Sequence, residues 1–232
     1  MIASCLPPSR EQRLGTNDVG QDIFSEMVYG SRVSLYIGIF AAFIVTGVGT
    51  VLALVSGYFG GVTDKIITAI TNVAMAVPSL PLTVLLVAYL NPGKWSLIIA
   101  ISVTAWTGTA RILRSRVMQL KELPFIKIEK TMGVHPVVIL FKHILPNIKD
   151  IILTRGAMSI SGAMMTEAGL SFLGLGEFGE KSWGSVLHYA FFRNSIMKKQ
   201  YWWYVPPIIC ICVCVFGFML IGYYGKIKKG GE

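Results

Sequence analysis

The chain has 232 residues, of which 53% are hydrophobic and only 14% are charged, and its mean hydropathy is +0.62. Soluble domains average about 25% charged residues, so this composition excludes an ordinary soluble domain and indicates an integral membrane protein. The 21 Lys and Arg residues exceed the 12 Asp and Glu residues. A nucleic-acid partner is not expected, because that function needs the basic excess on a solvated face without apolar runs of membrane length.

The first residues do not have the pattern of a cleaved leader. Residues 1–13 read MIASCLPPSREQR, without the apolar core of roughly 7 to 15 residues that a secretory signal needs. We expect residues 1–32 to form an external N-terminal segment and residues 33–232 to form the transmembrane domain.

Five apolar runs follow in chain order, and about 20 mainly apolar residues are enough to cross a bilayer core. They are rich in Gly, Ala, Ser and Thr, small residues that let membrane helices approach one another closely. The sequence therefore predicts an all-α fold, a polytopic transmembrane helix bundle in the cell membrane. The five predicted spans are residues 33–58, 66–90, 95–110, 151–173 and 205–224.

The cysteines and histidines do not predict a metal site. Three of the four cysteines lie in the last run, at Cys210, Cys212 and Cys214. On a helix Cys210 and Cys214 share a face while Cys212 points elsewhere, so the three thiolates do not converge. The three histidines are scattered along the chain, and we expect neither a metal site nor a disulfide framework.

The basic residues predict the orientation in the membrane. The polar connection at residues 111–149 carries eight cations against Glu122 and Glu129, which places it in the cytoplasm by the positive-inside rule. The C-terminal tail, with Lys226, Lys228 and Lys229, falls on the same side. Residues 174–204 then lie outside, although this segment also carries four cations: Lys181, Arg193, Lys198 and Lys199.

The glycine-rich stretch GLSFLGLGEFGEKSWG at residues 169–184 contains G-x-G-x-x-G and nearly spells a P-loop. A dinucleotide loop needs a preceding strand, and a P-loop needs Lys directly after the last Gly. Here the preceding element is a predicted membrane helix, and Glu180 stands between Gly179 and Lys181. The glycines fit a turn at the end of a helix better than a nucleotide site.

The cytoplasmic connection contains LPFIKIEKTMGVHPVVILFKHILP at residues 123–146. An amphipathic run, a break at Gly133 to Pro136 and a second apolar run predict two short helices at the membrane surface, with the break as their corner. These helices fit either an interfacial anchor for lipid headgroups or a docking element for a partner protein.

The fourth run contains two ionisable residues, Arg155 and Glu167. Each costs roughly 2.5 to 3.5 kcal/mol on insertion scales, and their spacing of about 18 Å along a helix prevents them from pairing. Arg155 either lines a pathway or extends to the cytoplasmic headgroups, whereas Glu167 suits a hydrogen bond within the bundle or at an outer gate. A polar and small face is predicted at Arg155, Met158, Ser159, Gly162 and Thr166.

At residues 123–146 the sequence resembles the permease subunits of ATP-binding-cassette importers, specifically the second permease of the dipeptide, oligopeptide and nickel group. The family's loop has E-A-A, a Gly four residues later and then I-L-P; Gly133 and HILP at residues 143–146 keep that spacing. The E-A-A positions are instead Lys127, Ile128 and Glu129. Three further blocks resemble the family: LGTNDVGQDIFSEMVYGSRVSL at residues 14–35, TEAGLSFLGLG at 166–176 and SWGSVL at 182–187.

The resemblance implies a pore-forming subunit, not an enzyme, that works with a second permease, two ATPase subunits and an extracytoplasmic solute-binding protein. ATP and Mg²⁺ would sit on the ATPases, with no cofactor on this chain, and the substrate would be a peptide, nickel or a metal chelate. Members usually have a membrane helix before the LGTD-like block, so a five-span form and a missing N-terminal piece both remain open. The residues implied in coupling to the ATPase are Lys127, Glu129, Gly133, His143, Leu145 and Pro146.

Two other classes of function are weighed against this one. An intramembrane enzyme needs a converging pair such as Ser with Lys, or an H-E-x-x-H helix, and the predicted spans contain neither. A self-contained channel or secondary carrier would not require a cytoplasmic docking element. A channel or secondary carrier is therefore less consistent with the docking element predicted at residues 123–146.

Overall fold

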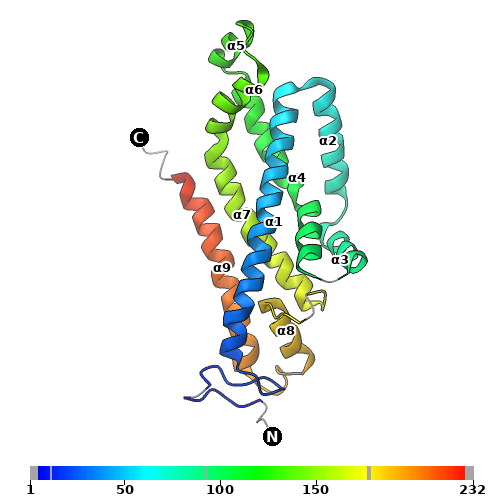
Figure 1. The fold of residues 1–232 in the computed structure, drawn as a ribbon, viewed down its shortest axis with the longest axis vertical. Coiled ribbons are helices and arrows are strands. Elements are labelled where there is room, and N and C mark those ends of the chain that lie inside the picture. Colours follow the sequence, from blue (N-terminus) through cyan, green and yellow to red (C-terminus); the bar gives the residue numbers. More distant parts are fainter. Residues whose placement is uncertain (1–4, 11, 92, 177–178, 228–232) are drawn as a thin grey trace. The chain divides into compact units, whose positions relative to one another are not determined.

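The computed structural model describes residues 5–10, 12–91, 93–176 and 179–227, and these are almost entirely helical (Figure 1). Their only β feature is an isolated bridge between Thr16 and Asp22. The elements are α1 (Ile23–Phe59), α2 (Gly61–Ala76), α3 (Ser79–Leu90), α4 (Lys94–Lys121), α5 (Pro124–Thr131), α6 (Pro136–Ile139), a π-helical turn (Leu140–Ile144), α7 (Leu145–Phe172), α8 (Trp183–Phe192) and α9 (Tyr201–Ile227).

The chain divides into two compact units, each with its own core. The first unit comprises the described parts of Met1–Ala41, Thr83–Ile101 and Ile160–Phe218, and the second those of Ala42–Leu82, Ser102–Ser159 and Met219–Glu232. Helices α1, α4, α7 and α9 each contribute residues to both units.

Three described helices, α1, α4 and α9, are long and apolar enough to cross a membrane, and the α2–α3 pair makes a fourth candidate if it counts as one bent span. This agrees with the predicted polytopic bundle and with the predicted runs at residues 33–58 and 205–224. Helix α7 has the necessary length, but its polar residues keep it outside that group. The number of five spans therefore stays a prediction.

The predicted run at residues 66–90 is not one straight helix. Helix α2 ends at Ala76, α3 begins at Ser79, and their axes differ by 88°. Pro78 disfavours a helical conformation for the residue before it, and Val77 is indeed extended, with φ −84° and ψ 128°. A single proline thus converts a continuous apolar run into two short helices.

The predicted boundary at residue 110 is also wrong, because α4 continues to Lys121. The eleven residues beyond it contain Leu113, Val117 and Leu120, which are buried at helical spacing. Val117 and Leu120 belong to the core of the second unit, together with Tyr58 and Ile144. About the first quarter of the polar connection at residues 111–149 is therefore helix that packs, and not loop.

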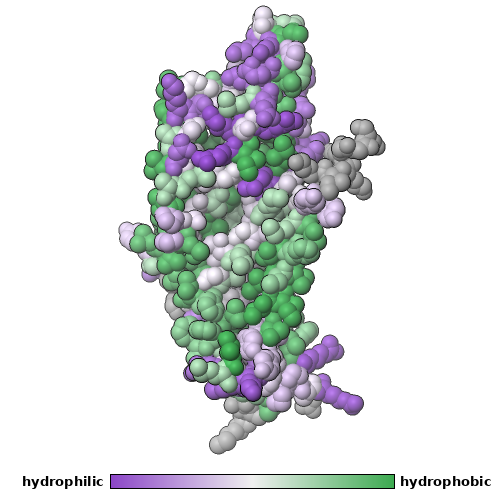
Figure 2. All heavy atoms as spheres, turned by 180° about the vertical axis from the view of Figure 1, so that it is seen from behind, coloured by the Kyte–Doolittle hydropathy of each residue, from purple (hydrophilic) through white to green (hydrophobic). Residues whose placement is uncertain are grey.

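The second unit is held by a close helix contact and an ion pair. A Cβ atom at Gly57 would lie 2.8 Å from Val117 of α4, so only glycine lets α1 come this close. Arg114 of α4 donates two hydrogen bonds of 2.6 Å to the carboxylate of Asp64 on α2, a bidentate geometry that fixes orientation as well as distance. Hydrophilic side chains gather at the end of this unit that carries α5 and α6 (Figure 2).

The core of the first unit contains two buried tryptophans, Trp183 and Trp203. The indole N–H of Trp183 donates to the backbone oxygen of Met27 at 2.9 Å, which ties α8 to α1. Helix α8 begins with a capping box formed by Ser182 and Ser185, a signature that satisfies two free backbone N–H groups. The SWGSVL block is thus the start of a packed helix.

The orientation can be tested by cysteine labelling in a chain whose native cysteines are replaced. We expect Lys130→Cys on α5 to react from the cytoplasmic side and Lys198→Cys to react only from outside, since both side chains are exposed and the basic connection is predicted inside. Ser182 is unsuitable because it is buried and caps α8, and Lys228 lies outside the described residues. Labelling of both positions from one side would contradict the orientation.

Candidate functional site

The predicted corner in the cytoplasmic connection is present between α5 and α6. Helix α5 ends at Thr131, and Gly133 then adopts φ +77° with no heavy atom within 4 Å of where a Cβ would stand. Glycine is needed here for its backbone conformation, since this region is costly for other residues, and not for a close approach. Pro136 starts the next helix, and the side chain of His135 accepts from the backbone N–H of Val137.

The second of the two predicted short helices, α6, does not end as a separate element. Helix α6 continues through the π-helical turn into α7 without a break. Pro146 lies in the first turn of α7 and has no N–H for the regular helical hydrogen bond, and the π turn directly before it accommodates that loss. Pro146 is exposed, whereas Leu145 packs against the core of the second unit.

Two predicted coupling residues meet each other. The imidazole Nε2 of His143 lies 2.8 Å from Oε1 of Glu129, and both side chains are about one-quarter exposed. The ring of Phe125 lies 6.2 Å from that of His143. Lys127 points elsewhere and pairs with Glu122 at 2.8 Å, where both side chains are well exposed; this hydrogen bond lowers the pKa of Glu122. Glu129 therefore ties α5 to the base of α7 from within the chain.

These two side-chain contacts of α5 should respond differently to mutation. Glu129→Ala removes the partner of a partly buried imidazole, and we expect it to destabilise the corner by about 1 kcal/mol. Lys127→Ala removes an exposed pair and should have no measurable effect. Protease sensitivity of the connection in membranes compares the two variants, and equal sensitivity would show that the Glu129–His143 pair does not hold the corner.

The corner also presents an apolar surface that no element in the described part of the chain covers. The buried side of α5 is Ile126, and the opposite side chains are exposed by 44 to 76%. Lys127, Lys130 and Lys142 flank them. Such a surface, with cations around apolar side chains, is typical of a docking element. We call it the corner face; its apolar residues are Phe125, Ile128, Met132, Val137, Val138 and Phe141.

The residues of the predicted polar face of α7 are half-buried or exposed. Gly162 is exposed, while Arg155 is half-buried and its Nε has no hydrogen-bond partner. The hydroxyl of Thr166 is used within the helix and donates to the oxygen of Gly162 at 2.9 Å. Met158 and Ser159 are also half-buried. Neighbours on the other side of α7 are buried: Ala157, Ser161, Ala163 and Met164.

Glu167 does not share that face. Its side chain is fully buried, and it accepts a hydrogen bond of 2.7 Å from the hydroxyl of Ser171 one turn later. The hydroxyls of Ser34 and Ser182 lie close to the same carboxylate, and Ser34 also accepts from the backbone N–H of Trp183. This contact is compatible with both roles predicted for Glu167, a hydrogen bond within the bundle or at an outer gate, and the choice between them stays a prediction.

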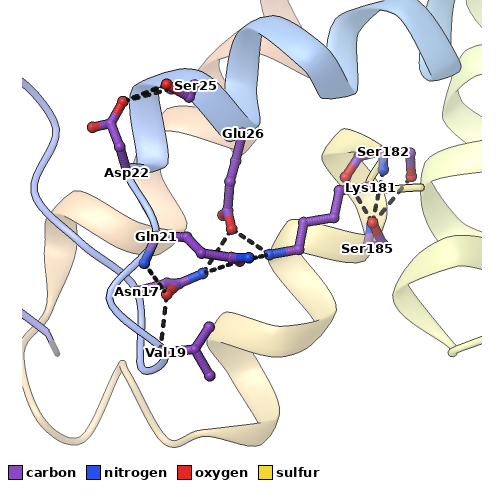
Figure 3. A network of polar contacts seen from close by, with 9 residues as sticks. All are labelled: Asn17, Val19, Gln21, Asp22, Ser25, Glu26, Lys181, Ser182 and Ser185. Carbon is purple, nitrogen blue, oxygen red and sulfur yellow. Dashed lines mark hydrogen bonds and ion pairs between the residues drawn. The ribbon is translucent and has the colours of Figure 1, made fainter. Parts of the chain in front are cut away.

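Sequence reasoning missed a polar network that joins two of the quoted sequence blocks (Figure 3). Glu26 in the first turn of α1 is 7% exposed at its side chain and forms an ion pair with Lys181 of the glycine-rich loop. Glu26 also accepts from the amide of Asn17 at 2.6 Å, and Lys181 donates to Gln21 as well. A lone carboxylate next to a membrane-length apolar run was the available signal, because such a group needs a partner.

A pocket of about 160 Å³ lies beside this network. Tyr189 and Trp203 contribute aromatic walls. A second ion pair, between Arg193 and Asp18 at 2.8 Å, lines it too. Within the described part of the chain, no group of three His, Cys, Asp or Glu side chains could hold a metal ion.

Comparison with known proteins identifies the family. Residues 49–225 match the family model described as "Binding-protein-dependent transport system inner membrane component". The chain belongs to this family. The permease is 37% identical over 219 residues to the oligopeptide transport system permease protein OppC of Bacillus subtilis (strain 168), an alignment that covers 93% of this chain and 70% of that protein. It is therefore a permease subunit of an ATP-binding-cassette importer in the cell membrane, and ATP hydrolysis in this family belongs to separate subunits.

Other relatives agree. The permease is 34% identical over 218 residues to the dipeptide transport system permease protein DppC of the same organism, covering 94% of this chain and 68% of that one. It is 35% identical over 216 residues to the glutathione transport system permease protein GsiD of Pectobacterium atrosepticum, with 93% and 71% covered. Its fold matches inward-facing structures of the MetNI methionine ABC transporter with a TM-score of 0.65, at 17% identity, over 87% of this chain and 97% of that one.

Proposed function

We propose that this permease forms, with a second permease subunit, the membrane pathway for peptides delivered by an extracytoplasmic solute-binding protein. Its relatives named above are peptide and glutathione permeases, which favours a peptide over nickel or a metal chelate. Two ATPase subunits would hold ATP and Mg²⁺, and this chain would hold no cofactor.

The corner face is the observation that supports this proposal most directly. A groove on an ATPase would receive the exposed side chains of Phe125, Ile128 and Met132, while the flanking lysines guide the approach. Because α6 runs through the π turn into α7, a displacement of the corner reaches α7 without a flexible joint. Two nucleotide-driven states of the ATPases would then select two positions of the permease helices.

The polar face of α7 is the proposed pathway lining. Arg155 has a free Nε in a half-buried position, and a guanidinium binds carboxylates such as a peptide C-terminus. We expect Arg155→Gln to raise the KM of peptide uptake about tenfold, the effect of losing roughly 1.4 kcal/mol, with little change in ATPase activity. Lys149→Gln, an exposed cation one turn from the start of α7, is the matched control. An unchanged KM would instead support the alternative that Arg155 extends to the cytoplasmic lipid headgroups.

The experiment that tests the proposed function is reconstitution of the permease with its candidate partners in vesicles. We expect uptake of a labelled dipeptide that requires ATP, the solute-binding protein and both ATPases, and competition by unlabelled peptide but not by Ni²⁺. Uptake by the permease alone, without ATP, would instead support a channel or secondary carrier. Competition by Ni²⁺ alone would overturn the peptide assignment and keep the importer.

A further inference from the structure

The segment between α8 and α9 carries cations that the importer function does not use. Of its three basic residues, Arg193 pairs with Asp18. Lys198 and Lys199 are both exposed, and no carboxylate in the described part of the chain pairs with either. Two adjacent cations therefore remain without an internal partner on the side where the positive-inside rule expects few.

The backbone holds these lysines in a defined turn. The N–H of Ser195 donates to the oxygen of Ala190 at 3.1 Å, and the N–H of Gln200 donates to the oxygen of Ser195 at 2.9 Å. Ser195 and Gln200 are buried, and Lys199 adopts φ +56°. Because its two anchors point inward, the turn presents the residues between them to the surroundings.

The same turn exposes large apolar side chains. Met197 is 84% exposed, Ile196 52% and Phe192 63%. Exposure of these apolar side chains to water is unfavourable. At a membrane interface they enter the acyl region while the lysines reach the headgroups. We call residues 192–199 the interfacial turn.

The position of the interfacial turn in the chain places it at the membrane surface. Gln200 alone separates it from α9, whose segment Tyr201–Gly225 is long and apolar enough to cross a membrane. Tyr201, at the start of that helix, is 55% exposed, and exposed Tyr and Trp residues are typical of the interface between hydrocarbon and headgroups. We therefore expect the interfacial turn at the depth of the lipid headgroups.

We propose that the interfacial turn binds an anionic phospholipid headgroup in the leaflet at the N-terminal end of α9. Lys198 and Lys199 donate to the phosphate oxygens, and Met197, Ile196 and Phe192 pack among the first acyl carbons. The occupant is a lipid because two adjacent cations directly follow exposed apolar side chains within one short turn. This site acts on membrane association and is independent of which substrate the permease carries.

The test uses the full-length permease extracted with its surrounding lipids into polymer-bounded discs from membranes of mixed phosphatidylglycerol and phosphatidylethanolamine. We expect discs of the wild-type chain to be enriched in phosphatidylglycerol relative to the bulk membrane. Lys198→Gln with Lys199→Gln should reduce binding at this site about fivefold for each lysine, following the electrostatic contribution of one cation near an anionic surface. Lys198→Arg with Lys199→Arg is the matched control, because it keeps both charges and should keep the enrichment.

Two further measurements make every outcome decisive. Met197→Gln keeps the charges and removes the apolar contact, so it should lower the enrichment less than the double glutamine variant does. Thermal unfolding of each variant checks the fold, and the Met197→Gln variant supplies the answer if the double glutamine variant unfolds. Equal enrichment for the wild-type and double glutamine chains would overturn the lipid site. If the double glutamine chain then also failed to bind the solute-binding protein, the turn would be a protein contact instead.

Discussion

Replacing Gly133 by valine should abolish most ATP-driven transport while leaving the permease inserted in the membrane. Gly133 has φ +77°, a region that costs other residues about 1 to 2 kcal/mol, and more for a β-branched side chain. A penalty of about 2 kcal/mol lowers the equilibrium constant between the native corner and other conformations about 30-fold. Because the corner face spans both sides of Gly133, the two parts that an ATPase would contact are misplaced together.

The control for this prediction is Gly133→Asn at the same position. Asparagine adopts positive φ more readily than other non-glycine residues, and no heavy atom within 4 Å obstructs a new Cβ. The asparagine variant should therefore keep most of the transport. Transport and ATPase activity are measured together in the reconstituted complex, with insertion checked by protease protection. Normal transport by Gly133→Val would mean that residues 123–146 are only an interfacial anchor.

Removing Lys181 should have the second large effect, which is on the stability of the fold. Lys181→Ala leaves the carboxylate of Glu26 buried with one cation fewer, and Glu26 is only 7% exposed at its side chain. Breaking a buried ion pair on one side costs about 3 kcal/mol or more, because the remaining charge is left without its countercharge. We expect a clear loss of thermal stability, with α8 and the N-terminal segment becoming more sensitive to protease.

A double variant shows whether the lost stability comes from the broken ion pair or from a disturbance of the glycine-rich loop. Glu26→Gln combined with Lys181→Met removes both charges and should recover much of the lost stability. Nucleotide affinity of the assembled complex should stay unchanged in all of these variants, since the loop is not a nucleotide site. A loss of ATP affinity caused by Lys181→Ala would contradict that interpretation, and wild-type stability of the single variant would contradict the ion-pair argument.

Much of the fold could be predicted because it depends on local signals. The apolar runs in α1 and α9 are long enough for the bilayer to determine their conformation. The break at Pro78 was readable in principle, since proline restricts the residue before it, but the hydropathy of residues 66–90 masked it. The extension of α4 to Lys121 was missed because Leu113, Val117 and Leu120 are separated by basic residues, which average to a polar segment.

The candidate site divides in the same way. The need for glycine at position 133 was predictable from its place between two amphipathic runs, and the positive φ confirms the backbone explanation. Pairing across distance was not predictable. Glu26 and Lys181 are 155 residues apart, and the sequence around either residue does not indicate which residue it pairs with. Glu129 was expected to face an ATPase, but its contact with His143 depends on how the chain returns at the corner.

The π-helical turn at Leu140–Ile144 determines the direction in which the corner face points. Such a turn holds one more residue than an α-helical turn, and each residue rotates a helix by about 100°. Residues before the turn are therefore rotated by about that angle, relative to α7, from where an unbroken α-helix would place them. Loss of one residue in this turn would swing the corner face around the helix axis with its side chains unchanged, so chain length in these few residues sets which subunit surface the corner can meet.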